Sequence, residues 1–362
     1  MATEQKLRFG FLGAGSIVIH RHALELFQNP DAELLMVYDP IKARAQSLAE
    51  TYGMKVAASE NALINNKNID AIVVATPNSE HARLTIASLL AGKHVLCEKP
   101  MATSLEDAAA MISTAEKTGK MLMIGHNQCM MAPHLKAKAL LSQGAIGEVL
   151  TFRSSFGHGG PETWSQDNGP HTWFFKKEKA YVGSMGDLGV HKAYLLPWLL
   201  GSDFVEAGAF IDTKAKCDEK GKPITVDDNA VCILRMANGI TGQLTASWTY
   251  GAREDNVTTI YGTKGQMIIG ADPDYQVEVL LNNGERARYK VGAVATNTCQ
   301  VKSGIPDLFV DCVLDDMPPP FDGMKGYRAL ATVVACMESA ASKKICPVQN
   351  ELPKTGKKSK KC

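Results

Sequence analysis

Several features that mark common classes of protein are missing from this sequence of 362 residues. No apolar run approaches the roughly 20 residues that a membrane-spanning helix needs. The segment from Met1 to Arg8 lacks the charged-then-apolar pattern of an export signal, and the chain contains no internal repeat. We therefore expect a cytoplasmic protein that does not have a membrane as its partner.

Cysteine, histidine and net charge exclude further classes. The nine cysteines are scattered from Cys97 to Cys362 without a CxxC pair, which fits free thiols in a reducing compartment better than a disulfide framework. No two Cys or His residues have the spacing of a zinc finger, so we expect no metal site. With 39 Lys and Arg against 38 Asp and Glu, the chain lacks the charge excess that binds nucleic acid or an anionic membrane.

The remaining composition is that of a soluble globular protein. Hydrophobic residues make up 45% of the chain and charged residues 21%, which is enough to bury a full core. The length is about twice that of a usual domain, so we expect one large domain or two ordinary ones.

The first third of the chain alternates between strand-like and helix-like segments. Strands are predicted over residues 7–12, 34–38, 71–75, 94–97 and 121–124, with helices over 16–28, 41–52 and 79–90. The run at 71–75 is apolar throughout, as expected for a strand that is covered on both faces. This alternation predicts an α/β domain with a doubly wound parallel sheet.

The pattern changes after about residue 147. A strand is predicted over 149–156, a helix over 185–200, several strands separated by turns over 228–290, and helices over 304–315 and 324–342. This order predicts a second α/β domain with a large, mainly antiparallel sheet. We expect a dinucleotide-binding domain at 1–125, a substrate-binding and oligomerisation domain at 126–350, and a disordered basic tail at 351–362. The final helix is in a position to pack back on the first domain.

The turn after the first strand has the form of a phosphate-binding loop. Gly13 permits the tight turn, and Gly15 lets the backbone approach a pyrophosphate. Ser16 and Ile17 begin the helix, whose N-terminus offers free N–H groups to an anion. The third glycine of the usual motif is replaced by Val18. A plain turn is the alternative, but the strand before it and the helix after it favour a dinucleotide site.

Asp39 follows the second strand, where an acidic side chain can accept hydrogen bonds from the ribose hydroxyls of adenosine. A carboxylate there would repel a 2′-phosphate, so the sequence favours NAD over NADP. Lys42 and Arg44 lie nearby and could weaken that exclusion. The alternative role for Asp39 is to cap the helix that begins near Pro40, and the two roles are compatible.

The triplet Glu98, Lys99 and Pro100 follows a buried strand. Ligands of open α/β sheets lie outside the carboxyl ends of the strands, so Lys99 is placed to accept or pass a proton there. On residue type alone, a solvated lysine in an ordinary turn is the simpler interpretation.

Four motifs together resemble the Gfo/Idh/MocA oxidoreductases in order and spacing. They are Gly13-Ala14-Gly15, Thr76-Pro77-Asn78 with His81, Glu98-Lys99-Pro100, and Asp187-Leu188-Gly189-Val190-His191. The resemblance covers nearly the whole chain except the tail. One departure is the segment 182–185, which reads Val-Gly-Ser-Met where many members of the family have a run of glycines.

The resemblance implies a Rossmann domain that binds NAD, followed by an α/β domain whose open sheet often forms dimer or tetramer contacts. It implies that Lys99, Asp187 and His191 are the catalytic set. It also places near the cofactor the residues Thr76, Asn78, His81, Glu98 and Asn127. The peptide bond before Pro100 is often cis in the family. Because the open sheet of the family often forms contacts between subunits, we expect a homo-oligomer.

Asp187 and His191 are four residues apart on a predicted helix and would share one face. A helix-stabilising pair is the alternative interpretation. Alcohol oxidation removes a proton from the hydroxyl and a hydride from the same carbon. We assign the proton to His191, with Lys99 hydrogen-bonded to the same oxygen, while the reverse assignment stays open. Asp187 would orient His191 or hold a substrate hydroxyl.

The segment from 156 to 181 concentrates aromatic and polar side chains, among them His158, Trp164 and Trp173. Aromatic faces pack against the C–H faces of sugar and cyclitol rings. Domain core is the alternative for each aromatic residue. His126 and Asn127 end a strand and could contact the substrate or the nicotinamide ribose.

We therefore predict an NAD-dependent dehydrogenase that oxidises a secondary hydroxyl of a sugar, glycoside or cyclic polyol. The preferred reaction is oxidation of the C3 hydroxyl of a glucoside to a 3-keto sugar, followed by inositol 2-dehydrogenase activity. The alternatives are a glycosidase or lyase that oxidises its substrate only transiently, an oxidoreductase that retains and recycles NAD, and a non-catalytic sensor.

Overall fold

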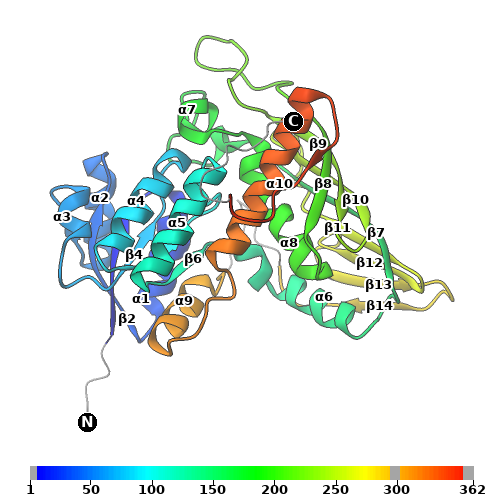
Figure 1. Ribbon diagram of the computed structural model, residues 1–362, viewed down its shortest axis with the longest axis horizontal. Helices are drawn as coiled ribbons and strands as arrows, with labels where there is room; N and C mark the ends of the chain where they lie inside the picture. The colour runs from blue at the N-terminus through cyan, green and yellow to red at the C-terminus, as the bar shows by residue number, and fades with distance from the viewer. Residues whose placement is uncertain (1–5, 294–301, 354–362) are drawn as a thin grey trace. The chain divides into compact units, whose positions relative to one another are not determined.

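A computed structural model describes residues 6–293 and 302–353 and divides the chain into two units (Figure 1). The first unit comprises Met1–Asn127 and Lys302–Tyr327, and the second comprises Gln128–Val301 and Arg328–Cys362. Helix α10 (Gly323–Ser342) begins in the first unit and ends in the second. Most of the tail expected at 351–362 lies outside the described residues.

The first unit is built on a six-stranded sheet in which every pair of neighbouring strands is parallel. Its order is β3-β2-β1-β4-β5-β6. The strands are β1 (Leu7–Leu12), β2 (Ala32–Tyr38), β3 (Lys55–Val56), β4 (Ala71–Val74), β5 (His94–Cys97) and β6 (Leu122–Ile124). The order reverses between β1 and β4, which creates the crevice at the carboxyl ends where such sheets bind ligands. The expectation of a doubly wound parallel sheet is confirmed.

Helices cover both faces of this sheet. They are α1 (Ala23–Gln28), α2 (Lys42–Tyr52), α3 (Glu60–Ile64), α4 (Asn78–Leu90), α5 (Leu105–Thr118) and α9 (Ile305–Leu314). In β1, the ring of Phe9 lies 6.1 Å from that of Phe309 in α9, while Gly10 lies directly against Leu63 of α3. Because successive side chains of a strand point to opposite faces, α3 and α9 cover opposite faces of β1. Figure 1 shows α4 and α5 side by side.

The second unit holds a nine-stranded sheet in the order β14-β13-β12-β11-β7-β10-β9-β8-β15. Its strands are β7 (Val149–Gly157), β8 (Phe204–Asp212), β9 (Asn229–Met236), β10 (Thr241–Ser247), β11 (Thr258–Gly262), β12 (Gly265–Ile269), β13 (Val277–Leu281), β14 (Arg286–Tyr289) and β15 (Cys346–Pro347). Strands β7 and β10 are paired in parallel and the other neighbours are antiparallel. This confirms the mainly antiparallel sheet.

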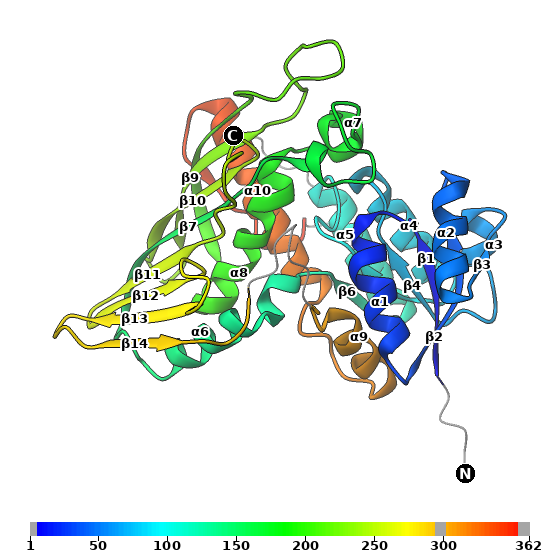
Figure 2. The same ribbon diagram turned by 180° about the vertical axis from the view of Figure 1, so that it is seen from behind.

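Helices α6 (Ala132–Ser142), α8 (Val190–Leu200) and α10 pack on one face of this sheet (Figures 1 and 2). The short α7 (Lys177–Ala180) lies in the segment between β7 and α8. Strand β9 shows the division, because Cys232 and Leu234 are buried while Val231 and Ile233 are exposed. In both views, no helix of the described chain covers the opposite face. The second sheet is therefore open on one side, as expected.

Two predicted helices begin with a wider turn than the sequence pattern implies. Residues Val18–His22 and Met185–Gly189 form single π-helical turns before α1 and α8. Such turns insert one residue into a helix and occur often at functional sites. The second of these turns contains Asp187, and His191 follows it in α8.

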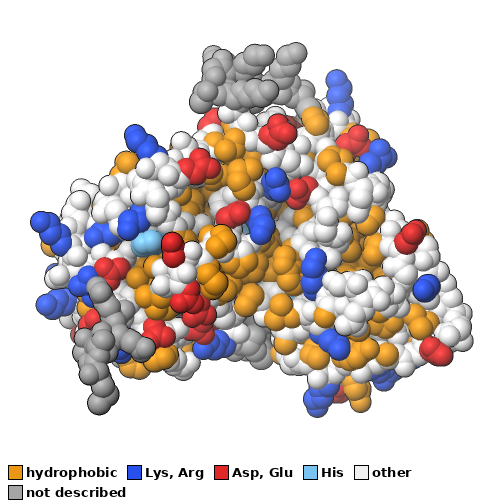
Figure 3. All heavy atoms as spheres, turned by 60° about the horizontal axis from the view of Figure 1, so that its bottom comes forward, with side chains coloured by type: hydrophobic (Ala, Val, Ile, Leu, Met, Phe, Trp, Pro, Cys, Tyr) orange, Lys and Arg blue, Asp and Glu red, His pale blue; other side chains and the backbone are white. Residues whose placement is uncertain are grey.

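On the face drawn in Figure 3, basic and acidic side chains are interspersed rather than gathered by sign. Within the described residues, no helix combines the length and apolar character needed to cross a bilayer. No group of three His, Cys, Asp or Glu side chains suited to a metal ion occurs in that part of the chain.

Candidate active site

The glycine turn after β1 has one glycine that the fold requires and one that leaves space. Gly13 has φ +100°, and a side chain there would overlap the carbonyl oxygen of Ala75 after β4. A side chain at Gly15 would meet no atom within 4 Å, so the backbone there is open to a ligand. Ser16 and Ile17 lead into the π-helical turn, and Val18 is fully buried. At the position of the missing third glycine, the side chain of Val18 is therefore part of the hydrophobic core.

Asp39 joins the end of β2 to this turn. One carboxylate oxygen accepts a hydrogen bond from the N–H of Ala14 at 2.9 Å, and the other accepts one from the N–H of Ile41 at 2.8 Å. Helix α2 starts at Lys42 with Ile41 as its N-cap, so Asp39 holds the turn before the helix rather than capping it. The half-buried carboxylate keeps lone pairs that can accept from a ribose. The open turn and this acid fit the adenosine half of a dinucleotide.

Glu98 is a nearly fully buried acid at the carboxyl end of β5. One of its oxygens lies 2.7 Å from Nε2 of His22, and the other accepts from the backbone N–H of Lys99 at 3.1 Å. Burial opposes ionisation of Glu98, but His22, Lys99 and Arg21 outweigh it and lower its pKa to about 2. A side chain at Gly125 would crowd this carboxylate. Glu98 is thus a fixed anion that anchors Lys99.

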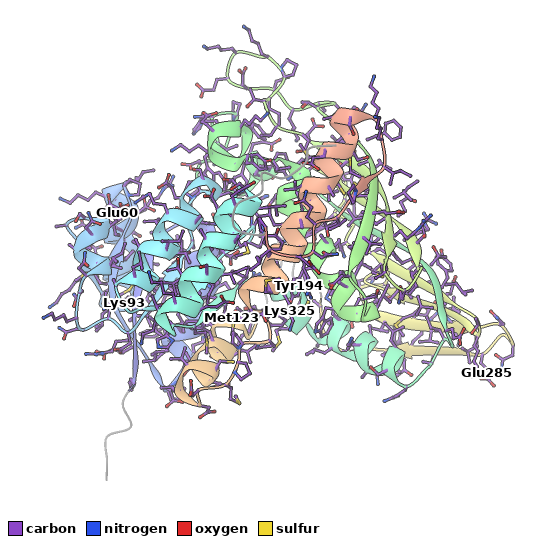
Figure 4. All side chains as sticks on the ribbon, in the orientation of Figure 1. Glu60, Lys93, Met123, Tyr194, Glu285 and Lys325 are labelled. Atoms are coloured by element: carbon purple, nitrogen blue, oxygen red, sulfur yellow. The ribbon has the colours of Figure 1, made fainter. Side chains whose placement is uncertain are left out.

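The peptide bond between Lys99 and Pro100 is cis, as the family resemblance implied. Lys93, labelled in Figure 4, offers a contrast, because it precedes β5 whereas Lys99 follows it. Its ammonium donates to the carbonyl oxygens of Asn66 and Ile69 at 2.7 and 2.8 Å, which makes it a structural lysine at the amino end of β5. Lys99 lies at the end where ligands bind.

His81 connects two loops at this edge. Its ring nitrogens lie 2.8 Å from the carbonyl oxygens of Thr76 and Pro100, and burial lowers its pKa. Both nitrogens are thus used by the protein, and His81 shapes the edge rather than reaching out of it. Asn78 begins α4 directly after the loop.

His126 and Asn127 follow β6 beside the same edge. The N–H of Gly125 donates to the carbonyl oxygen of Cys97 at 2.8 Å, which brings this loop next to Lys99. Burial, aided by the charge of Lys99, lowers the pKa of His126 to about 3, so the imidazole is neutral at physiological pH. The side-chain oxygens of Thr76 and Asn127 are buried and have no hydrogen-bond partner among the described residues. Unsatisfied buried groups at a ligand edge are ready to bind one.

The second unit positions its candidate residues on the segment from Met185 to Leu200. Asp187 lies in the π-helical turn and is buried, and its Oδ2 accepts a hydrogen bond from the indole N–H of Trp248 at 3.2 Å. His191 lies on the first turn of α8, and its ring is 5.7 Å from that of Phe156. The sequence analysis did not single out Trp248. The structure shows it fully buried, like an ordinary core residue, apart from its hydrogen bond to Asp187.

Asp227 fixes the start of the segment from Met185 to Leu200. Its carboxylate accepts from the backbone N–H groups of Gly183 and Met185 at 2.7 and 2.8 Å, and from the hydroxyl of Ser184 at 2.8 Å. Burial raises the pKa of Asp227 against these hydrogen bonds. A side chain at Gly183 would overlap the carbonyl oxygen of Asp227. The segment 182–185 lacks the family's run of glycines but retains Gly183, the one position where this close approach requires glycine.

The predicted substrate loop forms a continuous aromatic cluster. Ring centroids are 6.2 Å apart between His158 and Trp164, 5.3 Å between Trp164 and Phe174, and 3.9 Å between Phe174 and Trp173. Phe174 reaches Trp248 at 6.5 Å, which links the cluster to Asp187. Trp164 and Trp173 are half-buried, so each keeps an exposed surface. The structure thus brings the three predicted substrate residues of this loop into one cluster.

Two family models match the chain. "Oxidoreductase family, NAD-binding Rossmann fold" matches residues 7–126, and "GFO/IDH/MocA C-terminal domain" matches residues 134–268. The NAD-binding character expected for the first domain is thereby confirmed.

Several curated proteins are similar to the chain. D-glucoside 3-dehydrogenase of Escherichia coli is 28% identical over 93% of this chain and 96% of its own length. Myo-inositol 2-dehydrogenase of Thermotoga maritima is 27% identical over 93% and 97%. Levoglucosan dehydrogenase of Pseudarthrobacter phenanthrenivorans is 28% identical over 67% of this chain, and the match spans 66% of that protein. A solved levoglucosan dehydrogenase in complex with NADH has a TM-score of 0.83 at 24% identity, covering 95% of this chain and all of that one.

Proposed function

Since this chain belongs to the Gfo/Idh/MocA oxidoreductase family, we propose that it is an NAD-dependent dehydrogenase that oxidises a secondary hydroxyl of a glycoside or cyclic polyol. The observation that carries the proposal is the carboxyl edge of the first sheet. There the open turn at Gly15, the carboxylate of Asp39 and the anchored Lys99 follow the carboxyl ends of β1, β2 and β5. NAD, when bound, would accept the hydride from the carbinol carbon.

Proton transfer, charge stabilisation and positioning are assigned to individual side chains. His191 takes the hydroxyl proton, and Asp187, held by Trp248, positions it or a substrate hydroxyl. Lys99 donates a hydrogen bond to the same hydroxyl oxygen and stabilises the charge that develops on it. Glu98 and His22 fix the backbone of Lys99. Thr76, Asn78, His81 and Asn127 would form the nicotinamide side of the cofactor site, with His126 beside them.

The aromatic cluster supports a ring-shaped substrate. The half-buried faces of Trp164 and Trp173 suit the C–H face of a pyranose or cyclitol. We rank oxidation of the C3 hydroxyl of a glucoside first and of the C2 hydroxyl of an inositol second. The relatives named D-glucoside 3-dehydrogenase and myo-inositol 2-dehydrogenase support both. We place the activity in the cytoplasm, because all seven described cysteines are free thiols.

A screen of NADH absorbance over free sugars, methyl glucosides, levoglucosan and inositols tests the proposal. We expect NADH to form with at least one glycoside or cyclitol, and mapping of the product identifies the oxidised carbon. Release of the aglycone without net NADH would support transient oxidation instead. NAD that stays with the purified protein would support a self-recycling enzyme. Protein that binds NAD but oxidises nothing in the panel would contradict the proposed activity.

A further inference from the structure

Asn256 is a buried amide that no described residue satisfies. It lies between β10 and β11, and its side chain belongs to a residue that is only 8% exposed. Neither the amide oxygen nor the amide nitrogen has a hydrogen-bond partner within the described residues. Native proteins leave few buried polar groups unpaired, and those that remain require an explanation. Thr76 and Asn127, both proposed cofactor contacts, have the same feature.

The register of the strands places Asn256 opposite Phe156. Gly157 pairs with Asp255 on one side of this position, and Ser154 pairs with Thr258 on the other. Residues directly opposite each other in an antiparallel pair direct their side chains to the same face. Phe156 packs against the ring of His191 at 5.7 Å, so this is the face that carries the segment from Met185 to Leu200.

Lys192 stands beside the same aromatic ring. It is fully buried, and its ammonium lies 5.8 Å from the centroid of Phe156. Its one hydrogen bond among the described residues is a long one, 3.3 Å to the hydroxyl of Thr258, which in turn lies 2.8 Å from that of Ser154. An ammonium has three donors, so most of its capacity is unused.

The titratable groups that face Lys192 come from the loop before β11 and from α6. Asp255 and Glu254, from the loop before β11, attract its charge, and His134 of α6 lies near it. Burial nevertheless lowers the pKa of Lys192 to about 7. The structure therefore keeps a costly polar group next to His191 without giving it a full set of partners.

We propose that Asn256 and Lys192 form a pocket that binds a ring hydroxyl neighbouring the one that is oxidised. This inference rests on the proposed function and names its specificity determinant. A hydroxyl both donates and accepts, so it can satisfy the amide oxygen and the amide or ammonium nitrogen at once. A substrate without that hydroxyl leaves the pocket unsatisfied, which is the strongest basis for rejecting it.

The test compares the hydroxyl preference of the wild type with that of Asn256→Leu and Lys192→Met. The substrates are the glycoside or cyclitol selected by the screen above and its monodeoxy analogues, and the readout is kcat/KM. For the wild type we expect a loss of about 100-fold or more on the one analogue that lacks the recognised hydroxyl. Each variant should lose a similar factor on the parent compound and little more on that analogue. Lys138→Met is a matched control, because Lys138 donates to main-chain carbonyls at the end of α8 and has no proposed role at the site.

A uniform loss on the parent and on every analogue would show that the two residues serve only the fold and would overturn the proposal. Asn256→Ser is a milder change that keeps the experiment decisive if Asn256→Leu does not fold. The affinity of each variant for NAD is measured separately and shows whether the first unit is still folded. Wild-type protein that binds NAD but oxidises no substrate would contradict the proposed function itself, whereas normal wild-type turnover with uniform losses contradicts only the pocket.

Discussion

Among single residues, Glu98 is distinctive because it stays ionised while it is nearly fully buried. Its partners are His22, from the π-helical turn before α1, and the backbone N–H of the next residue, Lys99. A lone charge in this position would be unfavourable, so the anion depends on these partners. Glu98 therefore couples the stability of the first unit to the geometry of the proposed catalytic lysine.

We predict that this coupling appears in the pH dependence of stability. The pKa of Glu98 is lowered to about 2 from its usual value of 4.5, so its contribution to stability is present above pH 4.5 and is lost as the pH falls from there towards 2. Glu98→Gln should flatten this part of the curve of unfolding free energy against pH, measured by urea denaturation. Glu50→Gln, an exposed control on α2, should leave the slope unchanged. Equal slopes for wild type and Glu98→Gln would contradict the ionised state.

Lys99 and His191 are predicted to act in the same chemical step. Lys99→Met and His191→Ala should each lower kcat by roughly 10²-fold, the usual scale for acid–base groups. Because both would act on one hydroxyl, the double variant should lose clearly less than the product of the two factors. Lys93→Met is the control, since its ammonium serves main-chain carbonyls, and kcat should be near normal. Losses that multiply fully would separate the two residues into different steps.

Positions that depend on local sequence could be predicted. Gly13, Asp39 and Lys99 belong to short motifs that the sequence places after strands, and the structure has each of them there. His22 and Trp248 were missed because their partners lie 76 and 61 residues away in the chain. No spacing rule connects residues so far apart before the fold is known.

At the scale of elements, the start of the segment from Met185 to Leu200 depends on one carboxylate. We predict that Asp227→Ala lowers the unfolding free energy by about 1 to 2 kcal/mol, the usual cost of a lost cap, and reduces kcat because Asp187 follows closely. Thermal unfolding and turnover measure the two effects. Asp218→Ala is a matched control, since Asp218 accepts two backbone N–H groups in an exposed turn. Equal effects of the two variants would argue against the capping role.

Strands that are buried on both faces were predicted more accurately than strands with an open face. Strands β4 and β5 were predicted within one residue, because a strand covered on both faces is apolar throughout. Strand β8 was missed because its open face mixes glycine, acidic and apolar residues without regular alternation. The π-helical turn before α8 was missed because the sequence was compared only with a period of 3.6 residues.

At the scale of the whole molecule, the open face of the second sheet predicts self-association. Phe210 is 82% exposed and Ile233 is 62% exposed, and Gly208, opposite Ile233 on β8, adds no side chain to cover it. Apolar side chains gathered on one open face mark an interaction site. We predict a homo-oligomer that uses this face in each copy, as the open sheets of similar proteins implied.

Light scattering after size-exclusion chromatography tests this prediction. The double variant Phe210→Asp and Ile233→Lys should shift the protein to a smaller species, because charged groups would have to be buried in the interface. Leu90→Asp changes an isolated apolar residue that is 61% exposed on α4 and should leave the assembly unchanged. A monomeric wild type, or a variant of unaltered mass, would contradict the prediction.

The pairing of Phe9 with Phe309 has a consequence for how the protein is made. The nucleotide-binding unit starts with the first strand but receives α9 only after almost the whole second sheet has been translated. Until then, α9 does not cover one face of β1, and the apolar side chains on that face stay exposed on the nascent chain. A ribosome that stalls before residue 302 would release a polypeptide with every motif of the dinucleotide fold and an unfinished core, which makes it a natural client for chaperones.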